Sequence, residues 1–167
     1  MIRRTVVARA AASLILAGTL IAGTAGCTFI STQATLIHYD AGDGVGVSVG
    51  DLKVRNMLAL ISDDGRSVSL LMTVINSDTS GADLNIQYPS DGAKTTASRY
   101  INAGAARSFG NTVTDEKFIV LKPGVDAGGI LPIYLQYGDH EGVQVMVPVL
   151  NADLPQYEDL KPPATKR

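Results

Sequence analysis

The chain has 167 residues, of which 46% are hydrophobic and 18% charged, and this predicts one globular domain rather than a disordered chain. It contains no Trp and only 5% aromatic residues, so its core must be built from Val, Leu and Ile. Three of its 14 Lys or Arg and none of its 16 Asp or Glu precede Cys27, so residues 27–167 carry a net charge near −5. An acidic chain without a basic stripe repels phosphates, which excludes nucleic acid as a partner.

Residues 1–26 have the three zones of a bacterial signal peptide. Arg3 and Arg4 give a positive start, residues 10–22 are almost wholly apolar, and four small residues precede Cys27. The apolar stretch is too short and ends too promptly for a good membrane span. We therefore expect residues 1–26 to direct export.

The single cysteine of the chain, Cys27, closes the string TAGC, which resembles the bacterial lipobox. In such precursors the thiol receives a diacylglyceryl group, and cleavage makes the cysteine the new N-terminus. Two or more acyl chains give stable anchoring, whereas one binds only marginally. We expect an exported lipoprotein anchored through Cys27 to the outer face of a cell membrane. The alternative is an ordinary signal peptide followed by an incidental cysteine.

Composition divides the rest of the chain into three parts. Residues 27–44 are rich in Ser, Thr, Gly and Asp, which predicts a lipidated tether. Residues 154–167 contain three prolines and end in Lys-Arg, which predicts a flexible tail. The domain between them spans 45–153 and is large enough to bury a core without disulfides.

Short apolar runs alternate with turn-forming clusters of Gly, Pro, Asn, Asp and Ser throughout 45–153. Many of these runs have a period of two, the pattern of antiparallel β-structure. Val68 and Leu71 point to opposite faces of one run, so some strands are expected to be covered on both faces. Pro148 lacks a backbone N–H and indicates an edge strand or a bulge. The predicted strands are 52–61, 68–75, 83–88, 94–101, 118–121, 130–137 and 143–150, although 54–61 also fits a helical face.

One string resembles a catalytic motif. Residues 46–50, Gly-Val-Ser-Val-Gly, fit the G-x-S-x-G nucleophile elbow around Ser48, and Asp115 and His140 follow in triad order. The elbow requires a strained turn between a strand and a helix, whereas Val-Ser-Val favours an extended strand. We therefore interpret the string as small residues beside a strand, and a serine hydrolase is only our third hypothesis.

Soft metal donors are sparse after Cys27. The thioether and imidazole groups suit Cu(I), and they belong to His38, Met57, Met72, His140 and Met146. No two of them lie within four residues of each other, so there is no local binding motif. Met72 shares a strand face with apolar residues, which predicts a core position.

Asp40 and Asp43 lie among glycines as in a calcium loop, but the required carboxylate spacing and the closing Glu are missing. We interpret this segment as an acidic turn. The sequence therefore assigns no catalytic, cofactor-binding or metal-binding residue, and the one modified residue it assigns is Cys27.

Three segments carry a family resemblance: ATLIHYDAGDGVGVSVGDLKVRNMLAL (34–60), LLMTVINSD (70–78) and LPIYLQYGDHEGVQVMVPVLNADLPQYEDLKP (131–162). They resemble small actinobacterial envelope lipoproteins of the LpqE type. That group is similar in outline to periplasmic copper chaperones of the PCu(A)C kind. The resemblance implies an all-β fold, an antiparallel immunoglobulin-like or cupredoxin-like β-sandwich of about seven strands.

Chaperones of the PCu(A)C kind bind Cu(I) through spaced Met and His residues that end in a His-x-Met pair. Here Glu141 and Gly142 follow His140, so no site residue is carried over from the family. We expect a non-enzymatic, lipid-anchored envelope protein without a cofactor, a binding module for an unidentified envelope protein or ligand. The alternative is an envelope copper-handling protein of the PCu(A)C-like class.

Overall fold

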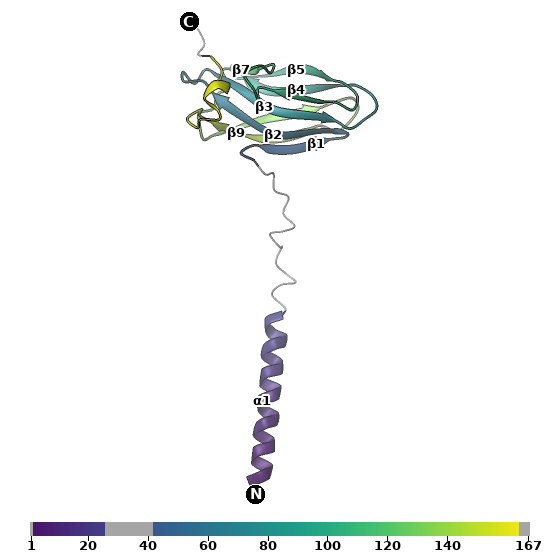
Figure 1. Ribbon diagram of the computed structural model, residues 1–167, viewed down its shortest axis with the longest axis vertical. Helices are drawn as coiled ribbons and strands as arrows, with labels where there is room; N and C mark the ends of the chain where they lie inside the picture. The colour runs from purple at the N-terminus through teal and green to yellow at the C-terminus, as the bar shows by residue number, and fades with distance from the viewer. Residues whose placement is uncertain (1, 26–41, 164–167) are drawn as a thin grey trace. The chain divides into compact units, whose positions relative to one another are not determined.

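The computed structural model describes residues 2–25 and 42–163 (Figure 1). The chain divides into two compact units, residues 1–39 and 40–167. The first unit contains helix α1 (Ile2–Ala25). Within the described residues, no helix has the length and apolar character needed to cross a membrane. The signal peptide stays a prediction, and Cys27 and His38 lie outside the described residues.

The second unit is built from strands, and its described part contains nine of them. All seven predicted strands are present, each within two residues of its expected ends. The helical alternative for 54–61 is wrong, because these residues belong to a strand. The two additional strands are short and lie before the first and after the fourth predicted strand. The nine are β1 (Val45–Val49), β2 (Leu52–Ile61), β3 (Ser67–Asn76), β4 (Ala82–Ser90), β5 (Ala93–Ile101), β6 (Ala106–Phe109), β7 (Phe118–Leu121), β8 (Ile130–Gln136) and β9 (Val143–Leu150).

The strands form one curled sheet in the order β5-β4-β8-β9-β2-β3-β6, with β1 also paired to β2 and β7 to β3. Every pairing is antiparallel except β2 with β9, which run parallel through Ala59–Val149 and Leu60–Leu150. The mostly-β prediction is therefore confirmed, and the purely antiparallel one is wrong. This short parallel pairing joins two antiparallel groups whose strands are far apart in sequence. The immunoglobulin-like or cupredoxin-like type stays a prediction.

The inward faces of both groups enclose one hydrophobic core. Its members are mainly Val, Leu and Ile, as predicted, and the other large side chains are Phe109, Phe118, Tyr137, Met57 and Met72. Met72 has no exposed surface, which confirms its predicted core position. Burial of each large apolar side chain contributes about 1.5–3 kcal/mol. This core holds β4 and β8 in place, and these two strands carry the site described below.

Pro148 was predicted to mark an edge strand or a bulge, but β9 lies between β8 and β2. The parallel pairing with β2 begins at Val149, directly after the proline. Pro148 therefore pairs with Ile130 of β8 and stands just before the pairing with β2 begins. A missing N–H is tolerated at such a position.

The stretch 42–44, expected to end the tether, packs on a bulge in β2. Asn56 has a φ of 50°, and the register shifts between Arg55 and Leu58. The Asn56 Oδ1 accepts a hydrogen bond of 3.0 Å from the Gly44 N–H. A Cβ on Gly44 would lie 2.6 Å from the Asn56 carbonyl carbon, so this close approach requires glycine.

Residues 154–163, expected to belong to a flexible tail, contact the outer side of β2 and β3 through Tyr157 and Leu160. The short 3-10 turn η2 (Glu158–Leu160) brings Leu160, 9% exposed, onto Leu58, Leu60 and Leu71. We call this side, at Leu58, Leu60 and Leu71, the covered face. Because Val68 points into the main core and Leu71 into this second cluster, β3 is covered on both faces, as predicted.

Candidate functional site

The three residues of the predicted catalytic string are placed separately. Ser48 lies inside β1 and pairs with Lys53 of β2, so its backbone is a regular strand rather than a strand-to-helix turn. Asp115 accepts hydrogen bonds of 3.1 Å from two backbone N–H groups of its own loop. The ring of His140 lies 4.5 Å from that of Tyr137 in the β8–β9 turn. Within the described residues no hydrogen bond joins the three, and the geometry offers no activated serine.

The described soft donors are also separated. Met57 and Met72 have no exposed surface, so their thioethers are closed inside the core. Met146 is 53% exposed and points outward from β9. His140 precedes β9, and Met146 lies three residues inside that strand, about 10 Å from its first residue at the usual rise. The contacts of the described residues do not bring these two accessible donors together, because His140 lies against Tyr137 and Met146 lies beside Gln144 and Pro132.

Asp43, one of the two residues of the calcium-like segment, has a structural partner, whereas Asp40 lies outside the described residues. The Tyr157 hydroxyl donates a 2.6 Å hydrogen bond to the Asp43 carboxylate. Burial and the adjacent carboxylate together raise the pKa of Tyr157 to about 12. This pair fixes the C-terminal segment to the start of β1.

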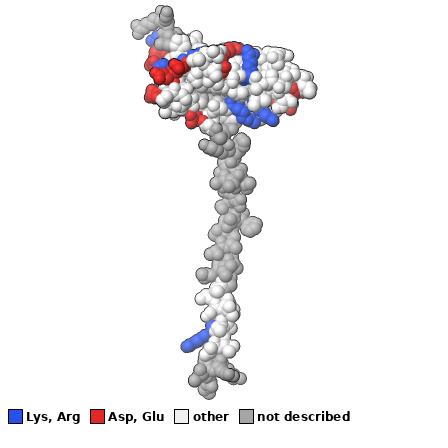
Figure 2. Space-filling view, in the orientation of Figure 1, with Lys and Arg blue, Asp and Glu red and all other residues white. Residues whose placement is uncertain are grey.

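Acidic side chains gather on the domain at the end where the C-terminal segment lies (Figure 2). A hollow of about 260 Å³ at this end is lined by Asp63, Asp126 and Asp153. The Lys161 ammonium lies 3.0 Å from the Asp63 carboxylate and offsets part of this charge. Across the described part of the chain, no group of three or more His, Cys, Asp or Glu could hold a metal ion. We therefore interpret this end as solvated acidic surface.

The outer side of β4, β5, β8 and β9 has a different character, and we call it the open face. Cross-strand pairs on β8 and β9 place Pro132 beside Met146 and Tyr134 beside Gln144. The first strand residue, Ile130, is 54% exposed, and Tyr134 is 40% exposed. The open face therefore presents apolar side chains to solvent along the same two strands whose other side forms the core.

The ladder between β4 and β8 stops after three pairs, the last of which is Gln87 with Tyr134. Continuing the same register would set Tyr88 opposite Ile133 and then Pro89 directly opposite Pro132. Proline has no N–H to donate, so two facing prolines cannot extend the ladder. The strands separate at this point, and the sheet opens between them.

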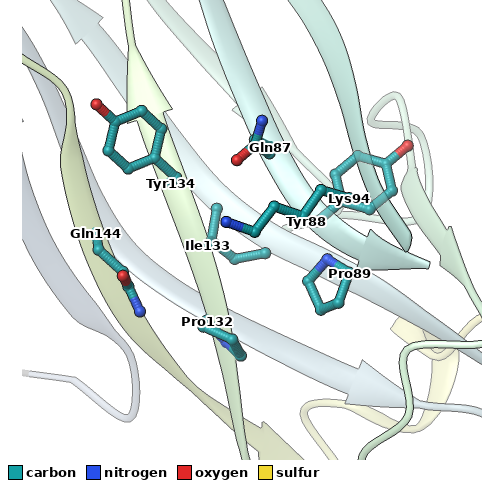
Figure 3. Close-up of a pocket in the computed structure, with 8 residues that line it drawn as sticks. All are labelled: Gln87, Tyr88, Pro89, Lys94, Pro132, Ile133, Tyr134 and Gln144. Carbon is teal, nitrogen blue, oxygen red and sulfur yellow. The ribbon is translucent and has the colours of Figure 1, made fainter. Parts of the chain in front are cut away.

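A cavity of about 150 Å³ lies at this separation on the open face (Figure 3). Its floor is formed by Tyr88, with the fully buried Ile133 behind it, and the two prolines form its walls. The hydroxyls of Tyr88 and Tyr134 point away from the centre, so their rings contribute apolar surface. The polar side chains at the rim belong to Gln87, Lys94 and Gln144.

Sequence reasoning missed this cavity. Pro132 lies inside the predicted strand 130–137 and Pro89 directly follows the predicted strand 83–88, and a proline at such a position marks a possible end of pairing. The register that sets Pro89 opposite Pro132 depends on the pairing of strands more than 40 residues apart, which the sequence pattern does not specify.

No protein-family model matches the chain, and no curated protein matches it. Solved structures do match. The apo PCuAC domain from PmoF1 is similar with a TM-score of 0.52 and 14% identity, over 63% of this chain and 98% of that one. The apo PCuAC domain from PmoF2 gives 0.51 and 15%, over 66% and 98%. The domain has the fold of these PCuAC domains.

A third structure, the copper-bound PCuAC domain from PmoF2, gives a TM-score of 0.49 and 13% identity, over 64% of this chain and 98% of that one. At these identities the likeness to PCuAC domains concerns the fold alone. The two apo domains bear out the resemblance to PCu(A)C proteins at the level of the fold, and the resemblance to LpqE-type lipoproteins stays a prediction.

Proposed function

We propose that this chain is a non-enzymatic, lipid-anchored cell-envelope protein that handles copper, as the alternative drawn from its sequence expected. The observation that carries the proposal is the fold, which the chain shares with two PCuAC domains. Two features of the sequence support a location in the cell envelope, namely its resemblance to LpqE-type lipoproteins and the lipobox-like string that ends at Cys27.

Met146 is the donor that we assign to copper. Thioethers suit Cu(I), and of the methionines in the described part of the chain this one is exposed. Its sulfur accepts a weak hydrogen bond of 3.7 Å from Gln144 Nε2, which an incoming ion can replace. Because Met57 and Met72 are closed in the core, few protein ligands surround the ion, an arrangement that suits transfer of copper rather than storage.

A Cu(I) competition titration tests this role. Residues 28–167 are suitable because the whole main core lies inside the unit 40–167 and the Cys27 thiol is absent. We expect one equivalent to bind and Met146→Leu to weaken binding by about tenfold or more. Met72→Leu, a buried change that nearly conserves volume, serves as the control and leaves the affinity unchanged. Binding no tighter than that of the unfolded chain contradicts copper handling.

The lipid anchor is tested separately by metabolic labelling with a fatty acid in a bacterial host. We expect label on the parent chain and on the neighbouring control Thr28→Ser, and none on Cys27→Ser, which accumulates as precursor. Label on Cys27→Ser at the parent level contradicts the lipobox interpretation.

A second role, a binding module for another envelope ligand, is favoured by one observation, the cavity on the open face. Ligand sites are commonly concave and mainly apolar with a few polar groups, and this cavity has that composition. A protein partner in the envelope stays a prediction from the sequence.

A further inference from the structure

The cavity between β4 and β8 has one charged group at its rim. Lys94 pairs with Pro89 across β5 and β4, and its side chain reaches over the opening toward Ile133 (Figure 3). No lining residue is acidic. The ion pairs found among the described residues use other cations, namely Arg99, Arg107, Lys122 and Lys161. The Lys94 ammonium is therefore available to an anion.

Two amides at the rim make only weak bonds within the protein. The Gln144 Nε2 donates to the Met146 sulfur at 3.7 Å, and the Gln87 Nε2 donates to the Thr96 hydroxyl at 3.4 Å. The first bond is weak because a thioether sulfur is a poor acceptor, and the second is longer than the usual N–H···O distance. A carboxylate is a stronger acceptor than either partner, so these amides can turn to a ligand at small cost.

Below this rim the surface is apolar. Ile133 has no exposure to solvent, and the ring of Tyr88 packs edge-on against Phe118 with centroids 5.6 Å apart. The floor is therefore held rigidly by the core. The volume of about 150 Å³ is sufficient for a group the size of benzene.

We propose that this cavity binds a small organic monoanion, a carboxylate that carries an apolar body of one ring or a short alkyl chain. The carboxylate pairs with Lys94 and accepts from the Gln87 and Gln144 amides, and the apolar body lies on Tyr88 between Pro89 and Pro132. The rim supplies one cation, which balances the charge of a carboxylate but only half that of a doubly charged phosphate. Aromatic carboxylates and short fatty acids share this chemistry. This site does not rest on the proposed copper role, although Gln144 lies between the cavity and Met146.

Amide chemical shifts of ¹⁵N-labelled residues 28–167 test the proposal, with benzoate, hexanoate and benzyl alcohol as probes. We expect saturable shifts at Gln87, Lys94, Ile133 and Tyr134 with at least one of the two carboxylates. Benzyl alcohol has the same ring without the charge, and we expect it to bind about tenfold more weakly. The preferred carboxylate identifies the source as aromatic or aliphatic, and failure of both to bind overturns the proposal.

Three variants assign the charge to one residue. Lys94→Met should bind benzoate and benzyl alcohol equally, whereas Lys94→Glu should prefer benzylammonium to benzoate. The control, Lys53→Met, removes an exposed lysine from β2 and should bind benzoate as the parent does. Retained benzoate preference in Lys94→Met, or shifts centred away from the cavity, overturns the proposal.

Discussion

The outer side of β2 and β3 and the outer side of β8 and β9 both carry apolar side chains, yet they have different surroundings. On the covered face, Leu58 and Leu71 are at most 2% exposed because Leu160 of the C-terminal segment lies on them. On the open face, Tyr134 and Met146 are 40% and 53% exposed. The first set stabilises the fold by burial. The second set is not buried in the isolated domain and so does not stabilise it. Exposed apolar side chains gathered around a cavity indicate a ligand-binding surface.

The largest expected difference between the faces comes from truncating one side chain on each. Leu71→Ala removes a side chain that is 2% exposed and should lower the free energy of unfolding by about 2–4 kcal/mol. Met146→Ala, its counterpart on the open face, should change it by no more than about 0.5 kcal/mol. Urea unfolding followed by circular dichroism measures both. Equal losses would remove the distinction between the faces.

Two leucines of the C-terminal segment test whether this segment packs on the covered face. Leu160→Ala should cost about 1.5–3 kcal/mol, because the leucine is 9% exposed on the covered face. Leu154, in the same segment, is 49% exposed, and Leu154→Ala should be nearly neutral. The same unfolding assay compares them. A neutral Leu160→Ala would mean that the segment does not cover the sheet in solution.

The bond from Tyr157 to Asp43 should contribute about 1 kcal/mol, so Tyr157→Phe destabilises by that amount near neutral pH. Because the folded pKa of Tyr157 is raised from 10.0 to about 12, the folded state holds the proton more tightly. Stability should therefore fall as pH rises between about 10 and 12, and Tyr157→Phe should lack this part of the fall. Tyr134→Phe, on the open face, is the control and should keep it. Parallel pH profiles for the parent and Tyr157→Phe contradict the pairing.

The smallest expected effect on stability concerns Lys94. This exposed residue has no ion-pair partner among the described residues, so Lys94→Met should change the free energy of unfolding by less than about 0.5 kcal/mol. Thermal or urea unfolding without ligand checks this. A loss above 1 kcal/mol would mean that the lysine supports the fold rather than a ligand.

The sequence alone predicts much of the sheet, because alternation and turn clusters depend on neighbouring residues. Seven strands and the burial of β3 on both faces follow from those local patterns. β6 was missed because its four residues, Ala-Arg-Ser-Phe, lack an apolar alternation. The parallel pairing of β2 with β9 and the packing of residues 154–163 depend on long-range contacts, for which the chain carries no local signal.

For the site, the sequence predicts properties of single residues better than their arrangement. The core position of Met72 follows from its strand face, and the strand conformation around Ser48 follows from Val-Ser-Val. The cavity arises from a register that no local pattern specifies, since Pro89 and Pro132 belong to different hairpins. A proline inside a strand is the signal worth following, because its partner across the sheet decides whether the strands separate.

Mapping of Cu(I) by amide chemical shifts on residues 28–167 tests most directly the claim that function lies on the open face. The proposed role predicts that the perturbed amides centre on Gln144, Met146 and the facing part of β8, while those of Leu58, Leu60 and Leu71 stay unchanged. Perturbation centred on Met57 and Met72 in the core or on the covered face, or no perturbation at one equivalent, would contradict it.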